Sequence, residues 1–204
     1  MIRLYTHPEN PQPRYIDKAV KVLSEGGLII YPTDTVYGLG CDLFNKRAVE
    51  RIYQIKGFTK KATLSFICPD LKDISQYAHV STPAYKVMRR LLPGPYTFIL
   101  EATRAVPKIL TEKRSTVGIR VPKNVVCRAL LQTFGHPIIS TSAALPGQGY
   151  VSDPNELEEL FQHRVDLLLD TDSGGIEPST IIDLTQDEPI LIRAGKGYRD
   201  DLLA

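Results

Sequence analysis

The sequence predicts an α/β fold: a single domain, residues 1–204, with one large, twisted, mixed sheet flanked by helices. Short apolar runs typical of buried strands are interspersed with segments of helical periodicity. The last two apolar runs flank Gln186-Asp187 like a hairpin, so the sheet cannot be wholly parallel. No internal repeat, low-complexity tract or long linker divides the chain.

Each predicted element rests on its own local pattern. Helices are expected where apolar residues recur at i, i+3 and i+4 and where capping residues or prolines start the run. They are residues 14–25, a segment with the stripe Val49, Ile52 and Tyr53, residues 70–77, a helix from Thr82 with Tyr85, Met88, Leu91 and Leu92 inward, residues 124–135, and residues 153–161. Strands are expected at 28–31, 63–68, 96–102, 116–121, 137–141, 165–169, 179–184 and 189–193. Pro32–Gly40 is predicted as a polar, glycine-bearing turn.

Composition narrows the class of protein. The chain is 43% hydrophobic and 24% charged, which is ordinary for a soluble globular protein. No apolar run approaches the ~18–20 residues of a membrane span, and the N-terminus has no apolar signal core, so we expect a cytoplasmic protein with no membrane partner. Cys41, Cys68 and Cys127 are too far apart for a zinc knuckle and odd in number for a disulfide framework. We expect them to be buried.

Charge is distributed unevenly along the chain. Residues 1–128 hold 21 Lys and Arg against 10 Asp and Glu, whereas residues 129–204 hold 4 against 13. One reading is a positive surface that attracts a polyanion, either a nucleotide or RNA. The alternative is that the two halves neutralise each other across a shared face.

Lys56 occupies a position where an apolar residue is expected. It continues the stripe of Val49 and Ile52, and an ammonium group cannot leave water there unpaired. It therefore either meets an anion near the hydroxyl-rich turn 32–40, or simply ends the helix with Gly57 as the cap.

Hydroxyl or cationic side chains recur near the ends of predicted strands. Since ligands of open α/β sheets gather at strand carboxyl ends, these side chains are candidates for one site. They are Thr33 and Thr35, Thr116 with Arg120, Ser140 to Ser142, Ser179 and Thr180, and Arg193. We expect Arg120 and Arg193 each either to pair with a buried acid or to bind a ligand carboxylate. Without a Walker A, GxGxxG or HExxH sequence, residue patterns alone indicate only an anion-binding α/β protein.

Six segments carry a family resemblance. PTDTVYGLG, IKG, TVGIRVP, STSA, PSTIIDL and LIRAG occur in this order over roughly residues 15–195. Their order and spacing resemble the YrdC/YciO family, whose best-characterised members make threonylcarbamoyl-adenylate for tRNA modification. The resemblance implies a YrdC-like fold in which these segments line one positively charged cavity.

The resemblance also implies a reaction and residue roles. L-threonine, bicarbonate and ATP would give threonylcarbamoyl-AMP and pyrophosphate, a nucleotidyltransferase reaction, with Mg2+ sharing the triphosphate charge. Lys56 would contact phosphate and, with Ser142, act in catalysis. Thr33, Arg120 and Ser179 would surround threonine, and Thr116, Ser140, Ser142 and Arg193 would hold the nucleotide.

Two departures from the family pattern stand out. Synthases of this family carry a tetrad resembling Lys-x-Arg plus Ser-x-Asn, whereas this chain has Phe58 in place of the arginine and Ala144 in place of the asparagine. Losing one preorganised donor costs ~10²–10³ in rate, so two losses predict a weak enzyme, unless Lys60 or Lys61 reaches in. The pattern resembles the YciO branch.

Three functions therefore remain open. The first is a weak threonylcarbamoyl-AMP synthase. The second is a protein of the same fold that binds double-stranded RNA or tRNA without efficient synthase activity. The third is a related carbamoyl transfer to another amine.

Overall fold

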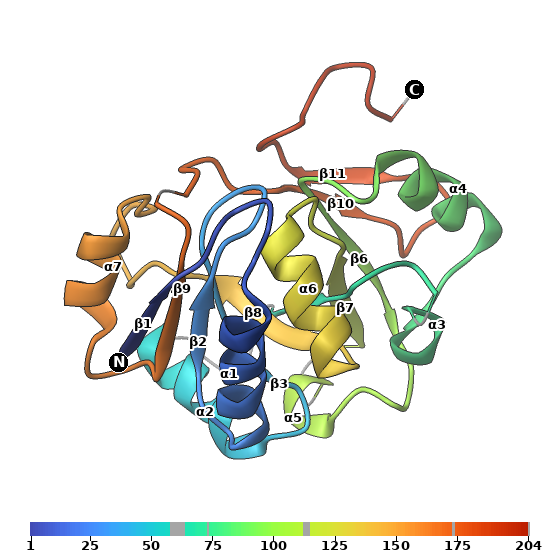
Figure 1. The fold of residues 1–204 in the computed structure, drawn as a ribbon. Helices are drawn as coiled ribbons and strands as arrows, with labels where there is room; N and C mark the ends of the chain where they lie inside the picture. The colour runs from blue at the N-terminus through green and yellow to red at the C-terminus, as the bar shows by residue number, and fades with distance from the viewer. Residues whose placement is uncertain (58–63, 73, 112–114, 173, 204) are drawn as a thin grey trace.

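The hydrogen-bonded sheet runs across the whole molecule, from β1 at one edge to β11 at the other (Figure 1). The computed structural model describes residues 1–57, 64–72, 74–111, 115–172 and 174–203. Its described helices are α1 (Pro13–Ser24), α2 (Lys46–Ile55), α3 (Ile74–Tyr77), α4 (Thr82–Leu91), α5 (Lys108–Thr111), α6 (Val125–Phe134) and α7 (Pro154–Phe161). Its described strands are β1 (Ile2–Tyr5), β2 (Ile29–Tyr31), β3 (Gly38–Asp42), β4 (Ser65–Ile67), β5 (Ala78–His79), β6 (Tyr96–Ala102), β7 (Thr116–Arg120), β8 (Ile138–Ser142), β9 (Leu167–Asp170), β10 (Thr180–Asp183) and β11 (Ile190–Arg193).

The sheet is mixed, as the sequence predicts. Its order is β1-β9-β2-β3-β8-β4-β7-β6-β10-β11, with β5 paired to β6 off this path. β1, β2, β4 and β10 have parallel neighbours, whereas β3 and β8 pair antiparallel. β10 and β11 form the expected antiparallel pair around the turn at Gln186.

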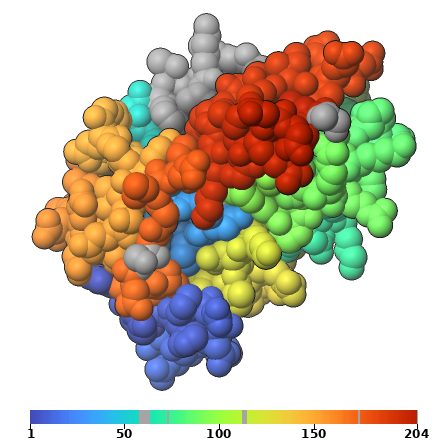
Figure 2. Space-filling model, turned by 90° about the horizontal axis from the view of Figure 1, so that it is seen from above, coloured from blue at the N-terminus to red at the C-terminus, as the bar shows by residue number. Residues whose placement is uncertain are grey.

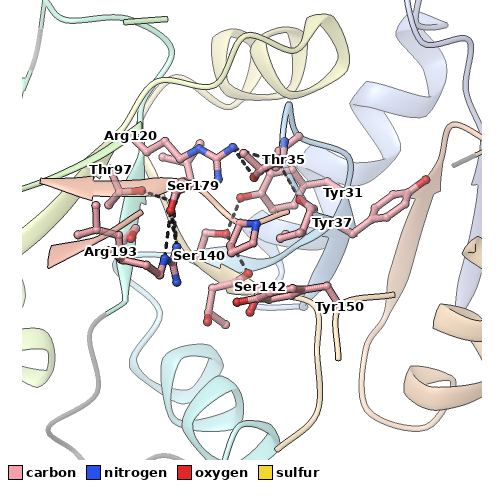
Figure 3. Close-up of a pocket in the computed structure, with 18 residues that line it drawn as sticks. Tyr31, Thr35, Tyr37, Thr97, Arg120, Ser140, Ser142, Tyr150, Ser179 and Arg193 are labelled. Atoms are coloured by element: carbon pink, nitrogen blue, oxygen red, sulfur yellow. Dashed lines mark hydrogen bonds between the residues drawn. The ribbon is translucent and has the colours of Figure 1, made fainter. Parts of the chain in front are cut away.

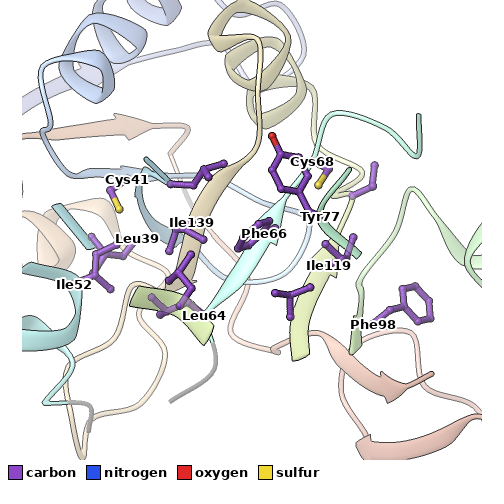
Figure 4. Close-up of a cluster of buried hydrophobic side chains, with 14 of the residues drawn as sticks. Leu39, Cys41, Ile52, Leu64, Phe66, Cys68, Tyr77, Phe98, Ile119 and Ile139 are labelled. Atoms are coloured by element: carbon purple, nitrogen blue, oxygen red, sulfur yellow. The ribbon is translucent and has the colours of Figure 1, made fainter. Parts of the chain in front are cut away.

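Strand alternation divides the core into two clusters, one on each face of the sheet. Leu39, Phe66 and Ile119 belong to the larger cluster, into which α2, α3, α4 and α7 pack (Figure 4). Their strand neighbours point to the opposite face, where α1 and α6 pack through residues such as Leu23 and Leu130. Those two helices lie side by side (Figure 1), and beyond them this second face carries mainly glycine, serine and threonine.

Several predicted elements need correction. Gly38–Asp42 is a strand, β3, and not part of a turn, because its glycines occupy positions where a neighbouring ring approaches the backbone. β1 and the short helix α5 were not predicted, since both are too short to show periodicity. Tyr85, placed on the inner face of its helix, is 47% exposed, whereas Ala84 faces the core.

The other predicted elements are present, most of them with shifted ends, whereas the predicted strand 96–102 coincides with β6. Some predictions fall on residues 58–63, which lie outside the described part of the chain. The start of the predicted strand 63–68 and the contact proposed for Lys60 or Lys61 are therefore not tested. Phe58 is also among these residues. All three cysteines are buried and free, as expected. No helix in the described residues is long and apolar enough to cross a membrane.

Candidate functional site

A pocket occupies the part of the second face that α1 and α6 leave uncovered (Figure 3). Its free volume is about 140 Å³, and together with its opening to solvent the empty space is about 660 Å³. It is lined by Tyr31, Thr33, Thr35, Val36, Tyr37, Gly38, Ser65, Ile67, Thr97, Arg120, Ser140, Thr141, Ser142, Tyr150, Pro178, Ser179, Ile181 and Arg193. In Figure 2 the loop after β2, in light blue, lies between the red C-terminal segment and yellow residues of α6.

Small residues make the hollow. A Cβ at Gly38 would lie 2.7 Å from the ring of Tyr31, and one at Gly118 would lie 2.9 Å from Oγ of Ser65. The Tyr31 ring therefore lies directly on the β3 backbone, and its hydroxyl donates a 2.6 Å hydrogen bond to Oγ of Ser140. Burial raises the pKa of Tyr31 well above its ordinary value, so this hydroxyl stays a neutral donor.

Arg120 lies at the end of β7 and is 8% exposed. Its Nη2 donates to Oγ1 of Thr35 at 2.7 Å and to Oγ1 of Thr33 at 3.2 Å, and it forms an ion pair with Asp34. Of the two sequence-based alternatives, the pairing with an acid is present. Because Arg120 also lines the pocket, the pairing does not exclude a ligand.

Arg193 and Ser179 form a second polar group in the pocket. Nε and Nη2 of Arg193 donate to the carbonyl of Ser179 at 3.1 and 2.7 Å. Oγ of Ser179 lies 2.9 Å from Oγ1 of Thr97. Within the described residues Arg193 pairs with no acid, so its positive charge is available to an anion in the pocket.

Lys56 ends α2, followed by Gly57 at a φ of 57°, and is only 7% exposed. Its ammonium group donates to the carbonyls of Ser142 and Ala144 at 3.0 and 2.5 Å, and lies 3.5 Å from Oγ of Ser142. Burial lowers the pKa of Lys56. Of the two sequence-based alternatives, the one in which the lysine ends the helix is present. Its contact with an anion stays a prediction, although it lies beside the pocket-lining Ser142.

Among the predicted site residues, Thr116, Thr180 and Lys56 do not line the pocket. Thr180 is fully buried and donates to the carbonyls of Gly195 and Lys196 instead. Thr116 starts β7 on the same face as Gly118 and Arg120, four residues before the arginine. Its predicted contact with nucleotide therefore stays a prediction.

The carboxyl ends of β7 and β8 do not meet at one edge of the sheet, contrary to the expectation from the sequence. β7 and β8 both pair with β4, the first parallel and the second antiparallel, so Arg120 is level with Ile138 and not with Ser142. Ser142 lies four residues further along β8, roughly 13 Å away at strand spacing. These residues share a pocket because the pocket extends across the face of the sheet, and not because their strand ends meet.

Sequence reasoning missed several lining residues. Ser65 and Thr97 alternate with the buried Phe66 and Phe98, so strand periodicity already assigns them to the other face of the sheet. The sequence does not show which face of the sheet the helices leave uncovered at these strands. Tyr150, in the loop after β8, gave no signal, because nothing in a loop sequence states which way a side chain points.

Comparison with known proteins gives the family. The family model for Sua5, YciO and YrdC proteins, described as "Telomere recombination", matches residues 21–195. The chain belongs to the Sua5/YciO/YrdC family. Its similarity extends to the Escherichia coli (strain K12) protein YciO, of uncharacterised function, at 44% identity over 95% of both chains. The crystal structure of E. coli YciO superposes with a TM-score of 0.94 and covers all of both chains.

Members of the Sua5/YciO/YrdC family named as enzymes are more distant. The threonylcarbamoyl-AMP synthase of Coxiella burnetii (strain RSA 493) is 35% identical over 78% of this chain and 86% of its own. Pyrococcus abyssi Sua5, solved in complex with L-threonine, has a TM-score of 0.89 at 29% identity and covers 96% of this chain, which spans 58% of that longer protein.

Proposed function

We propose that this protein binds L-threonine and ATP in the pocket and makes threonylcarbamoyl-AMP with low turnover. The observation that carries the proposal is the pairing of two arginines, Arg120 and Arg193, with hydroxyl side chains around one hollow of the sheet. An amino-acid carboxylate and a nucleotide phosphate both require such cations. Membership of a family that includes a threonine-bound Sua5 supports the choice of amino acid.

The roles follow from position in the pocket. Arg120 receives the threonine carboxylate, with Thr33 and Ser179 among the other residues that line the pocket. Ser140, Ser142 and Arg193 hold the nucleotide. Thr116 extends this set along β7, toward the pocket end opposite Arg120.

Lys56 stabilises the phosphates from the edge of the pocket. Its ammonium group already lies 3.5 Å from Oγ of Ser142, so a small change of its side chain brings it to a phosphate bound at that serine. The backbone carbonyls of Ser142 and Ala144 hold it in the absence of that phosphate.

The chemistry is carboxylation followed by adenylyl transfer. The threonine amine takes up the bicarbonate carbon with loss of water, which gives a carbamate. A carbamate oxygen then attacks the α-phosphorus of ATP, the bond from that phosphorus to the bridging oxygen breaks, and pyrophosphate leaves. Positioning of the two reactants and neutralisation of their charge supply most of the catalysis.

Mg2+ would enter as the counter-ion of the triphosphate. In the part of the chain that the structure describes, no group of three or more His, Cys, Asp or Glu is placed to hold a metal. Oxygen atoms of phosphate and water suit Mg2+ without a protein cage.

Low turnover is proposed because Ala144 offers no amide to the nucleotide, and Phe58 no guanidinium. The test is pyrophosphate release from purified protein in assays that omit threonine, bicarbonate or ATP in turn. The proposal requires release that depends on all three. Release that ignores threonine, or none above background from folded protein, contradicts it.

A further inference from the structure

Asp34 makes three contacts with two distant parts of the chain. One carboxylate oxygen pairs with Nη2 of Arg120, and the other accepts a 3.0 Å hydrogen bond from the backbone N–H of Lys123. Its backbone carbonyl accepts a 2.6 Å hydrogen bond from Nζ of Lys196. Its side chain is only 11% exposed. Asp34 is therefore held between the end of β7 and the C-terminal segment.

Arg120 is held by one corner of its guanidinium group. All its hydrogen bonds to described residues, to Thr33, Asp34 and Thr35, start from Nη2. Nε is buried and has no partner among the described residues. The guanidinium lies at the edge of the hollow, with its hydrogen bonds directed to the side of Thr35 (Figure 3). Nη1 and Nε thus remain unclaimed in a side chain that lines the pocket.

From this geometry we propose that Asp34 is a positioning residue: it fixes Arg120 by Nη2 and so directs the unclaimed N–H groups to the carboxylate of the amino-acid substrate. The inference rests on the proposed function, in which Arg120 receives that carboxylate. Asp34 itself does not line the pocket, so the substrate need not displace it. A guanidinium binds carboxylate well only in a defined orientation, because its N–H groups form a rigid fork.

Asp34 could instead compete with the substrate for Arg120, and the two roles predict opposite changes in substrate affinity when its charge is removed. If its carboxylate competed with the substrate for Arg120, removing its charge would tighten substrate binding. If it positions Arg120, the same change frees the side chain to rotate and weakens binding. One substitution therefore separates the two roles.

The experiment compares Asp34→Asn with the wild type by calorimetric titration of L-threonine and of L-threoninol, which lacks the carboxylate. We expect the threonine affinity of Asp34→Asn to fall about tenfold or more while the threoninol affinity stays within about twofold. Asp172→Asn is the matched control. Asp172 lies outside the pocket, and its carboxylate accepts a hydrogen bond from the hydroxyl of Tyr5. Unchanged or tighter threonine binding by Asp34→Asn overturns the inference.

A second variant and probe keep the outcomes distinct. Asp34→Glu keeps the charge but lengthens the side chain, so it should also weaken threonine and spare threoninol, even if Asp34→Asn does not fold. In the wild type, the NMR signal of the Arg120 Nε–H should shift on addition of threonine or acetate. A shift with acetate but none with threonine rejects threonine as the substrate; acetate then replaces threonine as the ligand in the comparison of Asp34→Asn with the wild type, where the same loss of affinity is expected. No shift with either ligand overturns the inference.

Discussion

The ammonium group of Lys56 lies 3.0 Å from the carbonyl oxygen of Ser142, which ties the end of α2 to the end of β8. The contact joins two segments 86 residues apart in the chain. It also places a buried cation beside the pocket without making it part of the lining.

Lys56→Met should therefore lower stability. It removes the Lys56 donor from the carbonyl of Ala144 and one of two donors from the carbonyl of Ser142, which still accepts from the N–H of Ala144. Losing a donor to a buried carbonyl costs about 1–3 kcal/mol, partly offset because no ammonium group has to be buried. Urea unfolding measures the difference. Lys46→Met, at an exposed position of the same helix, is the control and should change stability by less than about 0.5 kcal/mol.

The lowered pKa of Lys56 also predicts a pH dependence. Between this lowered pKa and the ordinary value of 10.5, the unfolded chain binds more protons at this residue than the folded one. The free energy of unfolding of the wild type should therefore rise with pH relative to that of Lys56→Met, as pH approaches 10.5. A constant difference between the two proteins across this window would contradict burial of the ammonium group.

The floor of the pocket should not tolerate a methyl group. Gly38→Ala places a Cβ 2.7 Å from the Tyr31 ring, which cannot move away without breaking its hydrogen bond to Ser140. We expect the free energy of unfolding, measured by chemical denaturation, to fall by about 1–3 kcal/mol. Gly149→Ala is the control, because a Cβ there meets nothing within 4 Å and its stability should be unchanged or slightly higher.

Gly38 and Gly40 show what the sequence can and cannot predict about the fold. Read alone, two glycines after Pro32 indicate a turn, and only the ring of Tyr31 lying on them explains why they belong to a strand. The mixed sheet, the closing hairpin and most helices follow from local patterns. The edge strand β1 does not, because four residues are too few to show a period.

The sequence indicated which residues line the candidate site, but not how these residues contact one another. Thr33, Arg120, Ser140, Ser142, Ser179 and Arg193 all line the pocket. That Asp34 pairs with Arg120, and that Lys56 faces carbonyls at the end of β8, depend on contacts between segments far apart in the chain. Periodicity within one segment contains no information on such contacts.

Restoring the tetrad is the next test. Phe58→Arg together with Ala144→Asn adds one guanidinium and one amide at the two positions where this chain departs from the synthase pattern that it resembles. If the pocket is otherwise competent, pyrophosphate release should rise by about tenfold or more. The two single variants and Ala144→Ser, which adds a hydroxyl but no amide, serve as controls. An unchanged rate in the folded double variant would mean that the site has diverged elsewhere.

RNA binding rests on charge alone and is tested separately. The excess of Lys and Arg in residues 1–128 predicts that a double-stranded RNA or tRNA binds through its phosphates. The logarithm of the association constant should then fall linearly with the logarithm of salt concentration, and different duplex sequences should bind alike. A flat salt dependence would contradict phosphate-driven binding.

The central claim is that threonine and ATP meet in this pocket and react. Incubation of the protein with L-threonine, ATP, Mg2+ and 13C-labelled bicarbonate, followed by mass spectrometry, tests it directly. We expect threonylcarbamoyl-adenylate that is one mass unit heavier than with unlabelled bicarbonate, and we expect Arg120→Ala not to form it. If the folded wild type forms none of this adenylate under conditions in which a Sua5 synthase forms it, the proposed function is wrong.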